Sequence, residues 1–168
     1  MSDLYREILI QRETPVTNKI LRVVLMALVA LCAVAGVLIT PLLLLAAIAL
    51  GAVLWVFVIP KLEVEYEYLY VNGELDIDAI YSKQKRKRVA GYDMQELEIL
   101  APSNSHALDS YLNGQGVKVK DFTSGRPQEK SYTLVLNQEK GREIIKVELD
   151  DVIVSDIRRI NPRKVNLI

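Results

Sequence analysis

The stretch KQKRKR places five basic residues within six positions: Lys83, Lys85, Arg86, Lys87 and Arg88. Lysine and arginine bind phosphate and carboxylate groups, so the cluster could contact nucleic acid, lipid headgroups, an acidic partner or acidic strands of its own domain. The net charge of the chain favours none of these ligands, because its 168 residues include 21 Lys and Arg and 21 Asp and Glu. The elements that position the cluster must therefore decide its ligand.

An uncharged run of 37 residues, from Val23 to Ile59, dominates the chain. A helix needs about 20 apolar residues to cross a hydrocarbon core of about 30 Å, and one straight helix of this length would be far too long. Thr40 and Pro41, near the middle, can end one helix and begin another. The run therefore predicts two antiparallel membrane spans, Ile20–Ile39 and Leu42–Ile59, joined by a tight turn.

Basic residues flank this run, whereas the turn between the spans carries no charge. Arg6, Arg12, Lys19 and Arg22 precede the uncharged run, and Lys61 follows it. By the positive-inside rule, we expect a multi-pass protein of the cell membrane with both termini in the cytoplasm. Two alternatives remain open. One is a signal peptide cleaved near the AVAG stretch at residues 33–36, and the other is a single long or re-entrant segment that places the C-terminal domain outside.

Residues 1–19 are predicted to form a cytoplasmic N-terminal segment. Leu4, Ile8 and Leu9 have helical spacing and Pro15 closes the segment. This pattern favours a short amphipathic helix on the inner membrane surface. The alternative is a tail whose apolar residues pack on the soluble domain.

After the second span the apolar residues recur at every second position, which indicates strands. Glutamates separate Val64, Tyr66, Tyr68 and Tyr70 up to the Asn72-Gly73 pair, and acidic residues separate Leu75, Ile77 and Ala79 beyond it. Asn-Gly supplies two residues with positive φ, so a two-residue turn would oppose Tyr70 with Leu75 and Tyr68 with Ile77. On the other face Glu67 opposes Asp78, an unfavourable pair that a neighbouring basic strand would relieve.

This hairpin returns the basic cluster to the membrane, because its two strands have equal length. We therefore expect contact with anionic headgroups through six residues: Lys61, Lys83, Lys85, Arg86, Lys87 and Arg88. Alternatively, one alternate set, either Arg86 and Arg88 or Lys85 and Lys87, pairs with the acidic face of the hairpin. Lipid contact and this internal pairing can hold together, because a strand divides its side chains between two faces. Nucleic acid is not expected as a partner, because the stretch lacks interleaved aromatic residues.

The remainder predicts further strands, a short helix near Ser103–Asn113, a second hairpin from Tyr132 to Leu149 and a closing helix capped by Asp150. The fold class is thus an α+β membrane protein. A transmembrane helical hairpin at residues 20–59 is followed, at residues 60–168, by a mainly antiparallel β domain with a C-terminal helix. This plan is that of pleckstrin-homology-like folds.

The sequence offers no catalytic site, metal site or cofactor site. The single histidine, His106, has no second ligand nearby, and the single cysteine, Cys32, lies within the first span. No glycine-rich phosphate loop and no nucleophile–base set is present, so we expect a protein that is not an enzyme.

Several stretches resemble an uncharacterised family of small bacterial membrane proteins. They are VEYEYLYVNGELDID, KRKRV, ILAPSNSHALDSY, VKVKDFTSG and INPRKV. The resemblance implies two spans and a cytoplasmic pleckstrin-homology-like domain, and it implies no activity. Because such folds recognise proteins as readily as lipids, it does not imply phosphoinositide binding.

Together these observations predict a non-enzymatic, membrane-anchored interaction module. The basic cluster would contact anionic lipid, while an exposed sheet edge or the loop Ser105–Tyr111 would bind a protein partner. The alternative is an accessory or assembly subunit of a membrane complex that acts through small residues of its spans: Ala27, Ala30, Ala33, Gly36, Ala46, Ala47, Ala49, Gly51 and Ala52.

Overall fold

The computed structural model describes residues 4–59, 63–83, 85–113, 118–127, 130–138 and 141–167. Its contacts divide the chain into two compact units. The helical unit comprises Glu13–Val64 and Tyr81–Lys85, and the sheet unit comprises Met1–Arg12, Glu65–Ile80 and Arg86–Ile168.

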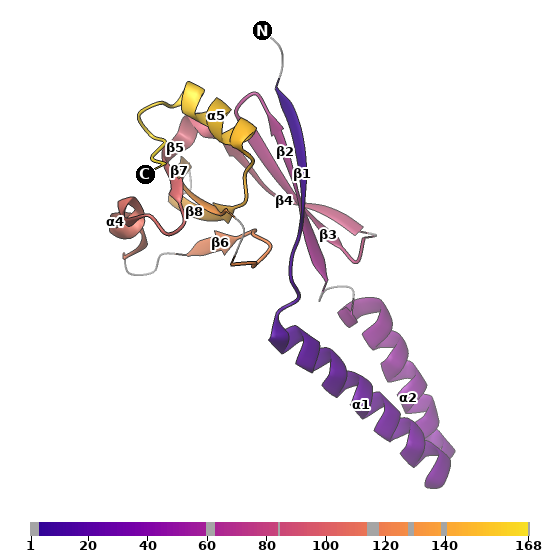
Figure 1. The fold of residues 1–168 in the computed structure, drawn as a ribbon. Helices are drawn as coiled ribbons and strands as arrows, with labels where there is room; N and C mark the ends of the chain where they lie inside the picture. The colour runs from indigo at the N-terminus through magenta and orange to yellow at the C-terminus, as the bar shows by residue number, and fades with distance from the viewer. Residues whose placement is uncertain are drawn as a thin grey trace. The chain divides into compact units, whose positions relative to one another are not determined.

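The helical unit contains the predicted hairpin. Helix α1 spans Val16–Leu38, helix α2 spans Pro41–Val53, and a π-helical turn, η1, continues α2 over Leu54–Val58. Thr40 is extended and Pro41 lies in the first turn of α2, so the break falls where the sequence predicted it. The two helices run side by side (Figure 1). Helix α1 begins four residues before the predicted start of the first span.

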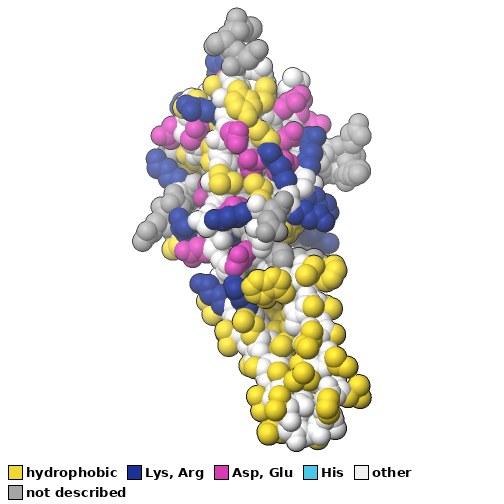
Figure 2. Space-filling view, turned by 90° about the vertical axis from the view of Figure 1, so that its right-hand side faces the viewer, with side chains coloured by type: hydrophobic (Ala, Val, Ile, Leu, Met, Phe, Trp, Pro, Cys, Tyr) yellow, Lys and Arg dark blue, Asp and Glu magenta, His cyan; other side chains and the backbone are white. Residues whose placement is uncertain are grey.

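The surface of this hairpin is largely apolar. Both helices have a mean hydropathy of 2.6 and are long enough to cross a membrane. Of the most apolar 18 residues in each, only 6% are buried in α1 and 11% in the α2–η1 segment. A core helix of a soluble protein would be mostly buried. Hydrophobic side chains instead cover the helices in the lower part of Figure 2.

The sheet unit begins with a strand at the N-terminus, so the predicted amphipathic helix is wrong. Strand β1, Tyr5–Gln11, pairs antiparallel with β2, Val64–Val71, from Tyr5↔Val71 to Gln11↔Glu65. Ile8 and Ile10 oppose Tyr68 and Tyr66 and are partly buried, whereas Leu9 is 58% exposed. Pairing with β2 satisfies the backbone and buries alternate residues, which outweighs the weak helical spacing.

Strand β1 changes how the domain is connected. The helical hairpin lies between the first and second strands of one sheet, rather than ahead of a complete domain. Because Gln11 pairs with Glu65, the chain leaves and re-enters this sheet at adjacent positions. The predicted division at residues 19, 59 and 60 left this first strand outside the domain.

The four-stranded sheet continues with β3, Glu74–Tyr81, and β4, Lys85–Asp93, in the order β1-β2-β3-β4. Asn72 and Gly73 have φ values of 48° and 98°, which confirms the predicted turn. The predicted apolar face is buried, with Tyr68, Tyr70, Leu75 and Ile77 fully inaccessible.

A second sheet has the order β5-β7-β8-β6, formed by Leu97–Pro102, Tyr132–Gln138, Gly141–Val147 and Val119–Asp121. Its pairs are antiparallel except for β6 with β8, which is parallel. The closing helix α5, Asp151–Ile160, is capped by Asp150, whose carboxylate accepts from the Ile153 amide at 2.8 Å. Short turns lie between β4 and β6: η2 at Met94–Glu96, η3 at His106–Leu108 and α4 at Asp109–Leu112.

Two tyrosine hydroxyls of β2 connect the first sheet to the rest of the sheet unit. Tyr68 donates to the Phe122 carbonyl at 2.7 Å, and Tyr70 donates to Asp156 of α5 at 2.8 Å. The hydroxyl of Tyr66 instead accepts from Arg12, which directly follows β1, at 2.7 Å. Burial raises the pKa of Tyr68 and of Tyr70, and the hydrogen bond to Asp156 raises that of Tyr70 further. These hydroxyls therefore stay protonated and available as donors.

Candidate membrane-contact site

Strand β4 divides the basic cluster between two roles. Arg86 pairs with Glu67 of β2 and with Asp78 of β3, where its Nε lies 2.7 Å from Oδ2, and Arg88 pairs with Asp76. Glu67 is only 8% exposed. A carboxylate buried to this degree is costly unless it is paired, so Arg86 offsets a charge that the sheet would otherwise leave unneutralised.

Gly91 makes room for the ion pair between Arg88 and Asp76. A Cβ at this position would lie 2.6 Å from Nη2 of Arg88 and 2.7 Å from Oδ1 of Asp76. The absence of a side chain therefore lets the guanidinium group reach the carboxylate. Of the two internal pairings that the sequence left open, the structure contains the one through Arg86 and Arg88.

The lysines of the cluster are arranged differently. Lys83, Lys85 and Lys87 are all exposed. Within the part of the chain that the structure describes, no hydrogen bond or ion pair joins their side chains to another residue. Three cationic side chains are thus available to an external anion. The sixth predicted contact residue, Lys61, lies outside the described residues.

The turn that carries Lys83 belongs to the helical unit, together with Ser82 and Lys85. Ser82 and Lys83 have φ values of 47° and 59°, which non-glycine residues rarely adopt. The Ser82 amide donates to the Glu63 carbonyl at 3.1 Å, which is the pairing that the predicted hairpin register requires. The Glu63 side chain in turn lies 3.0 Å from Nη1 of Arg22 on α1.

This link from Ser82 through Glu63 to Arg22 was not predicted from the sequence. Arg22 lies in the second turn of α1, one residue before the uncharged run begins at Val23. The β3–β4 turn is therefore tied to the charged end of the first apolar helix. The only sequence signal for it was the matched length of the two hairpin strands.

The other candidate residues do not form a site. The His106 side chain is fully exposed, and its Nδ1 lies 3.2 Å from Asp109. Among the described residues, no group of three His, Cys, Asp or Glu side chains could bind a metal ion. In the loop Ser105–Tyr111, Leu108 is buried and the Tyr111 ring lies under Arg142 at 5.2 Å.

Comparison with protein families gives a match over residues 2–167 to the family described as "Bacterial PH-like domain (DUF6106)". The chain belongs to this family. The resemblance and fold class drawn from the sequence are thereby confirmed. Searches of curated proteins and of solved structures each give no match.

The match extends over both units of this bacterial PH-like protein, so the family's pattern includes the apolar hairpin. PH-like domains are generally non-catalytic interaction modules, and the two apolar helices fit a membrane-associated module. The basic cluster is the largest concentration of one charge along its chain.

Proposed function

We propose that this PH-like protein is a non-enzymatic interaction module anchored in the inner leaflet, where its lysines contact anionic headgroups and its domain binds a protein partner. The observation that supports this most directly is the division of the basic cluster. The two arginines neutralise internal carboxylates, whereas the side chains of Lys83, Lys85 and Lys87 are exposed and have no partner among the described residues.

The proposed topology has both termini in the cytoplasm. Lys19 and Arg22 lie in the first two turns of α1, and the connection between α1 and α2 carries no charge. The positive-inside rule favours cytoplasmic placement of the basic end. The link between Arg22, Glu63 and Ser82 supports placing the lysine-bearing turn at the same level as that end.

Lysines near an anionic leaflet each contribute about 1 kcal/mol, so three of them would contribute about 3 kcal/mol. By the usual conversion this corresponds to a roughly 100-fold preference for the headgroup-bound arrangement. The contribution decreases with salt, because the Debye length shortens from about 10 Å at 0.1 M to about 3 Å at 1 M. Lipid charge and ionic strength are therefore the variables to test.

The test uses the full chain in lipid nanodiscs, because β1 and β2 enclose the membrane helices in sequence. Backbone amide exchange of the β3–β4 turn should be slower in anionic than in zwitterionic nanodiscs, and high salt should abolish the difference. A variant with Lys83→Gln, Lys85→Gln and Lys87→Gln should lose the difference too.

The matched control removes the same charge from exposed positions elsewhere, with Lys118→Gln, Lys130→Gln and Arg163→Gln. This control should keep the lipid-dependent protection. Equal exchange in the two lipids for the unmodified protein, or equal loss in both triple variants, would show that the lysines do not contact headgroups.

A second candidate function is that of an accessory or assembly subunit acting through its helices. Gly36 and Ala47 are buried within the hairpin, whereas several small residues face outward: Ala27, Ala30, Ala46, Ala49 and Ala52. Small outward residues are those through which membrane helices pack on other helices. A partner that co-purifies in mild detergent and is lost on Ala27→Leu and Ala30→Leu, but not on the lysine substitutions, would favour this function.

A further inference from the structure

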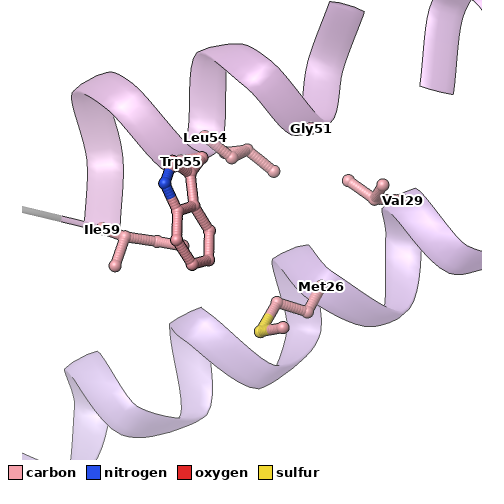
Figure 3. Close-up of a pocket in the computed structure, with 6 residues that line it drawn as sticks. All are labelled: Met26, Val29, Gly51, Leu54, Trp55 and Ile59. Atoms are coloured by element: carbon pink, nitrogen blue, oxygen red, sulfur yellow. The ribbon is translucent and has the colours of Figure 1, made fainter. Parts of the chain in front are cut away.

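An apolar groove runs between α1 and the α2–η1 segment. Its volume is about 200 Å³, and six residues line it: Met26, Val29, Gly51, Leu54, Trp55 and Ile59. Figure 3 shows the Trp55 ring extending from the α2–η1 segment toward α1, the helix that carries Met26 and Val29. Met26 and Trp55 are 53% and 68% exposed, so the groove opens to the surroundings of the helices.

Two features of the sequence keep the groove open. Gly51 contributes no side chain, and a Cβ there would already be 3.5 Å from Cγ1 of Val29. The helix then widens into the π-turn η1, in which the Ile59 amide donates to the Leu54 carbonyl five residues earlier. This wider turn falls at the positions of Leu54 and Trp55, on one wall of the groove. Such turns are rare and often mark functional sites.

Between the groove and the N-terminus of α1, the same face of the helix carries two cationic residues. Lys19, Arg22, Met26 and Val29 are spaced by three, four and three residues, so they share one face of α1. The Lys19 side chain is exposed and makes no hydrogen bond or ion pair with the residues that the structure describes. Among the same residues, the Arg22 guanidinium pairs with Glu63. From Arg22 to Val29 the helix rises about 10 Å, so charge and apolar lining lie within the reach of one lipid molecule.

We propose that this groove binds one acyl chain of an anionic phospholipid, with its phosphate on Lys19 and Arg22. A groove lined by apolar side chains accepts an apolar ligand, and the adjoining cations favour a lipid with net negative charge over a zwitterionic one. The site is separate from the headgroup contact of Lys83, Lys85 and Lys87. It depends only on the two helices lying in a bilayer.

The chain has a built-in reporter for this site, because Trp55 is its only tryptophan. Brominated acyl chains quench tryptophan fluorescence on contact. In full-length protein reconstituted in phosphatidylcholine bilayers, brominated phosphatidylglycerol should reach half-maximal quenching at an at least fivefold lower mole fraction than brominated phosphatidylcholine.

Two variants test the two halves of the site. Lys19→Gln should reduce the preference for phosphatidylglycerol toward equality, whereas Lys118→Gln should leave it unchanged. Gly51→Leu fills the groove and should weaken quenching by both lipids, with Val53→Leu, at an exposed position of the same helix, as the matched control.

The lysine triple variant of the β3–β4 turn should retain the preference, so loss of the surface contact and loss of this site can be told apart. Equal quenching of the unmodified protein by the two lipids would overturn the proposal. Trp55 protected from both lipids would overturn it as well, because the groove would then be covered by a second copy or by a partner helix.

Discussion

Gly36 should be the residue on which the close packing of the helical hairpin depends most. It is buried near the end of α1, and a Cβ there would lie 2.5 Å from the Leu44 amide nitrogen, 2.8 Å from the Leu44 Cα and 3.0 Å from the Leu43 carbonyl carbon. All three are backbone atoms, which cannot rotate away as the end of a side chain can. Carbon–carbon contacts are normally about 3.5–4.0 Å, so Gly36→Ala must separate the helices by about 1 Å at this point.

Overpacking of this kind costs about 1–3 kcal/mol, against which alanine gains up to about 1 kcal/mol in helix propensity over glycine. Gly51→Ala gains the same propensity, but its Cβ would be 3.5 Å from a flexible Val29 methyl group, which is an ordinary contact. We therefore expect Gly36→Ala to be less stable than Gly51→Ala by about 1–3 kcal/mol.

The assay is unfolding of the detergent-solubilised full chain by titration with sodium dodecyl sulfate, followed through the fluorescence of Trp55. The transition midpoint of Gly36→Ala should fall below that of the unmodified protein, while Gly51→Ala should match or exceed it. If both variants have the same midpoint, or if Gly51→Ala is the weaker, the close approach at Leu44 does not determine hairpin stability.

Two further outcomes follow from the sheet unit. A chain that begins at residue 60 lacks β1 and leaves the edge of β2 unpaired, so it should aggregate. A chain in which residues 13–63 are replaced by Asn-Gly, joining Arg12 to Val64 beyond the pair Gln11↔Glu65, should be a soluble monomer by size-exclusion chromatography. Asp156→Ala leaves the fully buried Tyr70 hydroxyl without its acceptor and should lower the free energy of unfolding by about 1–3 kcal/mol. Thermal unfolding should show a smaller loss for Asp151→Ala, at the exposed start of α5, and equal losses would exclude a special role of the Tyr70–Asp156 bond.

Local patterns were sufficient to predict the elements whose partners are near in sequence. The two helices follow from the uncharged run and from Pro41, and the β2–β3 hairpin follows from alternation on both sides of Asn72-Gly73. The pairing of Arg86 and Arg88 with acidic residues was one of two internal arrangements left open. Periodicity could not choose between them, since both sets of alternate residues are basic.

Strand β1 could not be predicted from local patterns, because its partner lies far away in the sequence. Tyr5 pairs with Val71, and the two apolar helices separate them in the chain. The apolar residues of this seven-residue segment fit both helical and alternating spacing, so by themselves they favour neither a helix nor a strand. The segment forms a strand because β2 offers it an edge that no other strand pairs with.

The connection through β1 also bears on how anchoring and folding are related in this protein. Two short segments, residues 12–15 and 59–63, join the helices to neighbouring strands that are hydrogen-bonded to each other. A single terminal linker would leave the domain able to fold before or without its anchor. Here the first strand and the rest of the sheet are synthesised on opposite sides of the hairpin, so the sheet can form only after both helices have been made and their ends brought together. The domain should therefore reach its stable form only after the hairpin has formed.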